Sequence, residues 1–135
     1  MATLVLTNAY ISVNAVVLSD HANSVTLNYE NDSIEITAFG DTGHKFTGGL
    51  QNNSCEIAFM QDFAASNVEA TLYPLVGTTT NVIIKPNGSV TSATNPAYTL
   101  TGAYLASHTP VAGAVGELAM TSVTFTGGTL AKAVS

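Results

Sequence analysis

The stretch of residues 33–50, SIEITAFGDTGHKFTGGL, indicates two strands joined by a long, polar loop. Apolar and polar side chains alternate up to Ala38, as in a half-buried strand, and the pattern stops at Gly40. A second alternating segment follows the glycines at 48 and 49 and places Cys55 and Phe59 on one face. The loop between the two segments is too long for a tight hairpin turn and holds no catalytic set, so we expect it to contact another protein.

Segments with strand patterns continue on both sides of this stretch. Alternating or β-branched residues predict strands at 10–13, 16–18, 25–29, 82–84, 97–107 and 118–126. Asn14-Ala15 fits a hairpin turn between the first two strands, and residues 30–33 are predicted to form another turn. Gly127-Gly128 should end the last strand and leave residues 129–135 as a free tail.

One helix is predicted, over residues 67–76. Its apolar stripe at helical spacing consists of Val68, Leu72 and Leu75. Ser66, followed three residues later by Glu69, forms a capping-box pattern, and Pro74 should shorten or bend the helix because it has no N–H to donate. We expect this helix to lie across an open end of the strand structure and to cover it.

These elements predict one domain spanning residues 1–135. The fold class is all-β: an antiparallel β-sandwich or partly closed barrel of about seven or eight strands, with one short flanking α-helix. The composition agrees, because the polar residues are mainly Thr, Ser and Asn, which favour strands and turns.

Charged side chains are unusually few. The chain has three lysines, no arginine and nine acidic residues, for a net charge of −6. A surface with so little charge cannot keep neighbouring molecules apart, which favours life in an assembly over a β-domain with a Thr-rich coat. Three scattered lysines also cannot neutralise a run of phosphates, so tight nucleic-acid binding is not expected. No long apolar run or basic N-terminal segment is visible, and we expect no membrane partner and no signal peptide.

No set of residues predicts an enzyme, a metal site or a bound cofactor. Asp20 and His21 are neighbours in a predicted turn, and adjacency in sequence is not evidence for a catalytic set. Asp41 and His44 could supply two metal ligands, but no third is apparent. Cys55 is the single cysteine and lies on an apolar strand face, where a buried, unreactive thiol is expected. We therefore predict no catalytic residues, no metal and no cofactor.

Three stretches in this order resemble the tail tube (major tail) proteins of long-tailed bacteriophages. They are EITAFGDTG…F..GL from residue 35, FMQDFAASNVEATLYPLVGT from residue 59 and NPAYTLTGAYL from residue 95. The resemblance covers roughly residues 10–130, and its most specific part is the strand–loop–strand segment 35–59. The chain departs from the pattern in being short, with no appended surface domain.

The resemblance implies a structural virion protein that assembles with itself into rings, expected to be hexameric, which stack into a hollow tube for DNA passage. Sheets of neighbouring subunits would then join edge to edge. Its partners would be other copies of itself and other phage tail or head proteins. It would be assembled in the host cytoplasm and be located in the virion. Small capsid decoration proteins and head–tail adaptors can share the same core, and these remain the alternative.

Two sets of residues follow from this interpretation. The predicted subunit-contact loop consists of Asp41, Thr42, Gly43, His44, Lys45, Phe46 and Thr47. The predicted lumen-facing acids are Glu30, Asp32, Glu35 and Glu56. An acidic or neutral lumen would repel phosphate and let DNA pass without adhering to the wall.

Overall fold

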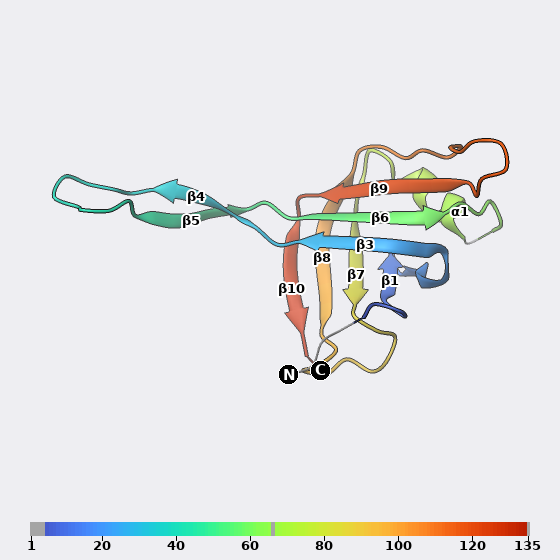
Figure 1. Cartoon of the computed structure of the whole chain (residues 1–135), viewed down its shortest axis with the longest axis horizontal. Coiled ribbons are helices and arrows are strands. Elements are labelled where there is room, and N and C mark those ends of the chain that lie inside the picture. Colours follow the sequence, from blue (N-terminus) through green and yellow to red (C-terminus); the bar gives the residue numbers. More distant parts are fainter. Residues whose placement is uncertain (1–4, 66, 135) are drawn as a thin grey trace.

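The computed structural model describes residues 5–65 and 67–134. Figure 1 shows a β-rich body and a long two-stranded hairpin that projects from one side of it. The hairpin consists of β4 (Asn31–Glu35) and β5 (Phe46–Gln51), which pair with each other in a sheet of their own. The predicted all-β fold with a single short α-helix is confirmed, and its sheet does not close into a barrel.

One antiparallel sheet forms the body. Its strands are β1 (Tyr10–Val13), β2 (Val16–Val17), β3 (Ala22–Asn28), β6 (Ser54–Met60), β7 (Thr79–Lys85), β8 (Ala97–Leu105), β9 (Met120–Thr126) and β10 (Thr129–Ala133). Their order is β2-β1-β7-β8-β9-β6-β3, and β10 also pairs with β8. Strands β3, β6 and β9 run crosswise to the others (Figure 1). The sheet therefore folds over on itself into two layers.

The corner between the two layers lies where β8 meets β9. Only two register pairs join these strands, Tyr104 with Thr126 and Leu105 with Phe125. The earlier part of β8 pairs instead with β10. Because β8 changes partner along its length, the sheet can turn the corner without leaving either half of the strand unpaired.

Period-two alternation builds the core as predicted. Cys55, Ile57 and Phe59 are fully buried on the inner face of β6, and Phe125 and Val123 of β9 pair with Cys55 and Ile57. The β-branched run on β7 contributes its own buried side chains. Along β6, β7 and β9, buried residues alternate with more exposed ones, which is the arrangement that a two-layer sandwich requires.

The predicted helix exists but is shorter than expected. It consists of α1 (Val68–Leu72), followed by a single 3-10 turn, η2 (Tyr73–Leu75), because Pro74 cannot continue the α-helical hydrogen bonding. The apolar stripe is buried in the core, as predicted. The capping-box prediction involves Ser66, which lies outside the described residues. Another short 3-10 helix, η1 (Ser19–His21), precedes β3.

Two boundaries near the hairpin were predicted wrongly. Residues 31–33 belong to β4 and do not turn the chain, which runs on from β3 into the projecting hairpin (Figure 1). Ile34 and Ile36 are 51% and 53% exposed, although their alternation predicted a half-buried strand. Nothing in the described part of the body packs over them, because the hairpin extends beyond the sheet.

The predicted free tail is also wrong, because residues 129–133 form β10. Gly127 and Gly128 both have positive φ and fold the chain back onto β8. A Cβ at Gly128 would come within 2.5 Å of the Thr101 carbonyl oxygen, so the approach of the two strands requires glycine here. The sequence signal was correct for a turn but did not reveal the strand after it.

Candidate subunit-contact arm

The projecting hairpin is the strongest candidate for a functional element, and we call residues 29–52 the arm. Its base is fixed by Asn53, whose side chain is buried. The Asn53 Oδ1 atom accepts the Glu30 N–H, and its Nδ2 donates to Gln51 Oε1 at 2.8 Å and to the Gly128 carbonyl. The side-chain amide of Asn53 thus joins the arm to the β9–β10 turn. Sequence reasoning missed Asn53, since a single Asn between two strands carries no distinguishing pattern.

The tip of the arm is organised by its own hydrogen bonds. The Asp41 carboxylate accepts the Ala38 N–H at 2.8 Å and forms an ion pair with Lys45 Nζ at 3.0 Å. The Ala38 N–H, with help from the Lys45 ammonium, lowers the pKa of Asp41 below its usual value. Residues 41 and 45 therefore hold the turn together.

A second pair lies beside this turn. His44 Nδ1 hydrogen-bonds to Glu35 Oε2, and the same carboxylate oxygen accepts the Thr37 hydroxyl at 2.9 Å. Asp41 and His44 thus have different partners, Lys45 and Glu35. The two candidate ligands are directed to separate contacts and do not converge on one point.

The predicted contact loop is found at the outer end of the arm, with one difference. Residues 41–45 lie in the connection between the strands, whereas Phe46 and Thr47 already belong to β5. The strand pairing reaches this far because Glu35 and Ile34 of β4 pair with them. The predicted loop is thus the connection of a two-stranded hairpin, and its last two residues are the start of the second strand.

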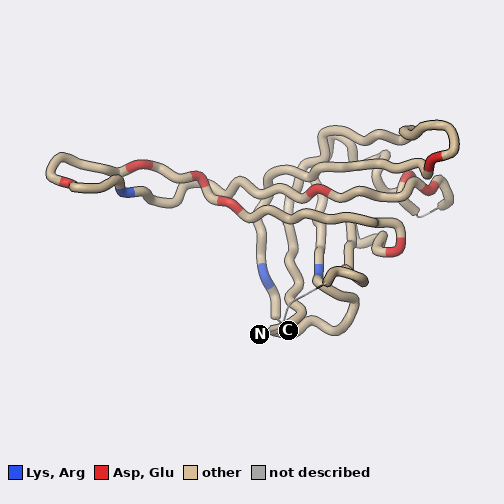
Figure 2. The backbone as a smooth tube through the Cα atoms, in the orientation of Figure 1, with Lys and Arg blue, Asp and Glu red and all other residues tan. Residues whose placement is uncertain are grey.

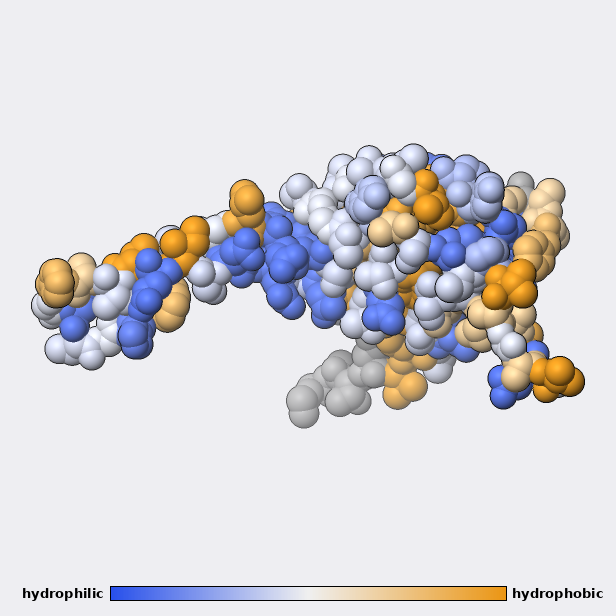
Figure 3. Space-filling model, turned by 90° about the horizontal axis from the view of Figure 1, so that it is seen from above, coloured by the Kyte–Doolittle hydropathy of each residue, from blue (hydrophilic) through white to orange (hydrophobic). Residues whose placement is uncertain are grey.

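The arm exposes many large apolar side chains. They are Tyr29, Ile34, Ile36, Phe39, Phe46 and Leu50. Phe39, next to the turn, is completely exposed, and apolar groups recur along the arm in Figure 3. A soluble monomer rarely presents so many apolar groups together, so a surface of this kind marks an interaction site.

The predicted lumen acids do not form one group. Glu30, Asp32 and Glu35 belong to the arm, whereas Glu56 belongs to β6 of the body. Figure 2 shows acidic residues on both parts. Glu56 is exposed on the outer face of β6, between Thr26 of β3 and Thr124 of β9. Its neighbours in register carry hydroxyls and no charge.

All three histidines contact carboxylates. The partners of two of them are far away in sequence: Asp62 for His21 and Glu69 for His108. His21 Nε2 lies 2.8 Å from Asp62 Oδ2, and its Nδ1 lies 2.8 Å from Asp20 Oδ1. Because both ring nitrogens face carboxylates, both must donate, and this geometry fits the charged imidazolium. The hydrogen bond that His21 donates to the Asp62 carboxylate is the main cause that raises the pKa of His21. Sequence adjacency suggested only the partner at position 20.

His108 anchors the helix to the sheet. Its side chain is 2% exposed, and its Nε2 lies 2.8 Å from Glu69 Oε2 of α1. Its Nδ1 lies 3.2 Å from the Thr121 hydroxyl of β9. Glu69, which the capping-box pattern assigned to the helix start, therefore points to the body.

The single thiol and the metal-ligating side chains of the described residues lie in separate surroundings. Cys55 is buried, and desolvation raises its pKa to about 12, so the thiol stays protonated and unreactive. Within residues 5–65 and 67–134, no group of three or more metal-ligating side chains comes together. In the same ranges, no helix is both long and apolar enough to cross a membrane.

The ion pair between His21 and Asp62 predicts how the stability of the fold depends on pH. The raised pKa of His21 means that its contribution to stability is fully present below pH 6.5 and is lost as the pH rises through the raised value. The pKa of Asp62 is lowered from 3.8, first by the Ala64 N–H and then by His21. Its contribution is present above pH 3.8 and is lost as the pH falls through the lowered value.

Replacing His21 by Gln should therefore reduce the free energy of unfolding most at about pH 5 and progressively less above neutral pH. Urea unfolding of wild type and variant across this range measures the difference. His44→Gln is the matched control, because its carboxylate pair lies on the exposed arm and outside the core. A deficit for His21→Gln that stays constant to about pH 8 would contradict the charged bridge.

Comparison with solved structures identifies chains with the same fold. A chain of the sheath/tube terminator of an extracellular contractile injection system, in its extended state, aligns with a TM-score of 0.73 and 12% identity, over 98% of this chain and 97% of that chain. The sheath–tube complex of such a system contributes a match with a TM-score of 0.71 and 13% identity, over 98% and 93% of the two chains.

A chain from the virion of a native gene transfer agent particle aligns with a TM-score of 0.69 and 12% identity, over 93% of this chain and 95% of that chain. No protein-family model matches the sequence, and no curated protein matches it. The resemblance to tail tube proteins is thus confirmed at the level of the fold, over nearly the whole chain.

Proposed function

We propose that this protein is a structural subunit of a phage or phage-like tail, and that its copies assemble into rings that stack into a hollow tube. The observation that carries the proposal is the arm: a hairpin with many exposed apolar side chains, which projects from a body with a tail-tube-like fold. Long edges left free by such a body would also invite pairing between neighbouring copies. Contacts between different surfaces of identical subunits can close into rings and continue as stacks.

We also propose that the outer face of β3, β6 and β9 contributes to the wall along which DNA passes. This face pairs Thr26 with Glu56 and Glu56 with Thr124, and it is rich in hydroxyls. The three lysines lie elsewhere, on the arm, on β7 and on β10. A wall of hydroxyls with a single carboxylate per copy would not trap phosphates. The arm residues Glu30, Asp32 and Glu35 would add negative charge where the arms meet this wall.

Negative-stain microscopy of the purified chain tests this function. We expect hollow cylinders of variable length that grow with protein concentration. A reconstruction of these cylinders would then give the ring number, expected to be six, and the residues that line the channel. A channel lined mainly by Lys45, Lys85 and Lys132 would contradict the proposed wall, and a chain that stays monomeric at every concentration would contradict the tube.

A second candidate is a ring that ends or connects a tube, with the chain acting as a terminator or a head–tail adaptor. It is favoured by the similarity to a terminator chain, which is as strong as that to the sheath–tube complex. The same micrographs distinguish the two functions. Single rings that do not lengthen with concentration would support the terminator or adaptor, whereas cylinders would support the tube subunit.

A further inference from the structure

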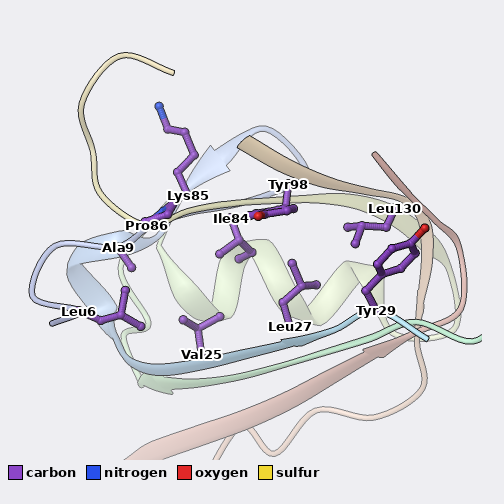
Figure 4. Close-up of a pocket in the computed structure, with 10 residues that line it drawn as sticks. All are labelled: Leu6, Ala9, Val25, Leu27, Tyr29, Ile84, Lys85, Pro86, Tyr98 and Leu130. Atoms are coloured by element: carbon purple, nitrogen blue, oxygen red, sulfur yellow. The ribbon is translucent and has the colours of Figure 1, made fainter. Parts of the chain in front are cut away.

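An apolar groove opens between the two layers of the body. Its volume is about 450 Å³. Figure 4 shows Val25, Leu27 and Tyr29 on one side, and Ile84, Tyr98 and Leu130 on the other, with their side chains directed into the gap. The groove is thus an unfilled extension of the core, accessible from outside.

Two strand edges border this groove. Within the described residues, β3 pairs only with β6, and β10 pairs only with β8. The groove is therefore a cleft in which backbone and apolar side chains are both available. A cleft of this kind suits an extended or hairpin-shaped protein segment.

Two of the three lysines lie at the groove. Lys85 lies at one end of the lining, but its side chain points away from the gap in Figure 4, and its Nζ donates to the Ser89 carbonyl at 2.9 Å and lies over the Tyr10 ring. Lys132 is exposed on β10, two residues after Leu130 and opposite Tyr98, so it lies on the same face of the strand as the lining Leu130. The groove is apolar inside, and Lys132 places a positive charge at its border.

The arm has the complementary character. Phe39 is completely exposed beside the turn and has no covering residue in the described chain. The arm carries four carboxylates, Glu30, Asp32, Glu35 and Asp41, against the single cation of Lys45. An exposed apolar side chain with surrounding negative charge matches an apolar groove with positive charge at its border.

We propose that the arm of one copy inserts Phe39 into the groove of a second copy, with the arm's carboxylates beside Lys132. The occupant is a second copy because each arm extends away from its own body (Figure 1). Such a contact joins two different surfaces of the same chain, so it repeats from copy to copy. The inference deepens the proposed function, because it specifies which two surfaces meet when copies assemble.

Photo-crosslinking from the arm tests this contact. Phe39 is replaced by p-benzoylphenylalanine, which keeps an aromatic side chain at this position, and the variant is mixed with wild type labelled with ¹⁵N. After irradiation, we expect crosslinks to labelled peptides containing residues 25–29, 84–86, 98 or 130. The label proves that the contact joins two copies. The same probe at Val115, which is equally exposed on the loop after β8, is the control and should not label these peptides.

Each alternative result decides the inference. Crosslinks to the hollow beside α1, which contains Tyr73, Val76 and Pro110, or to a second arm tip, would overturn it. No crosslink at concentrations where wild type assembles would overturn it as well. Cylinders without the groove crosslinks would leave the proposed tube standing, whereas groove crosslinks without cylinders or rings would support this contact and contradict the tube.

Two substitutions give an independent measurement. Phe39→Ala should raise the concentration needed for assembly at least severalfold, and Phe39→Leu should restore most of the loss because it keeps an apolar side chain for the groove. Lys132→Glu should weaken assembly and reduce its sensitivity to salt, since it removes an attraction between unlike charges. Equal assembly by Phe39→Ala and wild type would overturn the contact.

Discussion

Deleting residues 42–45 is expected to leave a folded chain that no longer assembles. These residues form the turn of the arm, and none of them belongs to the core. The deletion also removes the Lys45 ion pair with Asp41, which organises the turn beside Phe39. Changes on an exposed surface usually alter stability by less than about 0.5 kcal/mol, so the body should keep its melting temperature.

The measurement combines thermal melting by circular dichroism with negative-stain microscopy of the same preparation. The expected pair of results is a melt close to that of wild type and the complete loss of cylinders or rings. If the deletion variant builds assemblies of normal appearance, residues 41–47 are not the contact element. If it melts far below wild type, the arm supports the body, and its assignment as a separate element is wrong.

Leu72→Ala is expected to have the largest effect on the isolated subunit. Leu72 is 0% exposed on α1 and packs in the core with Val68 and Leu75. Truncating a buried leucine costs about 2–5 kcal/mol, from lost apolar contact and from the cavity left behind. That is a large part of the stability of a domain of this size.

Urea unfolding of the monomer at low concentration measures the loss directly. Tyr73→Ala is the matched control, since Tyr73 follows Leu72 in the chain but is 67% exposed. The control should cost far less than the core substitution. If Leu72→Ala leaves the monomer unchanged but prevents assembly, the helix stripe would face a neighbouring subunit, and α1 would be an interface element.

Local patterns in the chain were enough to locate most strands of the body and their buried faces. Alternation at Cys55, Ile57 and Phe59 matched the buried face of β6 because a strand exposes its two faces to different surroundings. The spacing of Val68 and Leu72 identified the helix and its buried side for the same kind of reason. These are local properties, fixed by backbone geometry and carried by residues close together in the chain.

Whether an alternating segment is covered depends on long-range packing. Ile34 and Ile36 have the same pattern as a half-buried strand, yet they lie on the arm, beyond the reach of the body. The pattern records that two faces differ in polarity, but it does not say what packs on the apolar one. That depends on which distant strands the fold brings close, and for the arm we propose that a second copy supplies the cover.

The long-range partners were equally beyond the sequence. Asp62 meets His21 across 41 positions, and the tail becomes β10 because β8 offers it a free edge. The groove exists because β3 and β10, more than 100 residues apart, border the same opening between the two layers. Contacts of this kind are set by the pairing order of the strands, and pairing order is chosen by the whole chain: each strand edge can accept many partners, and only the packed sheet excludes all but one.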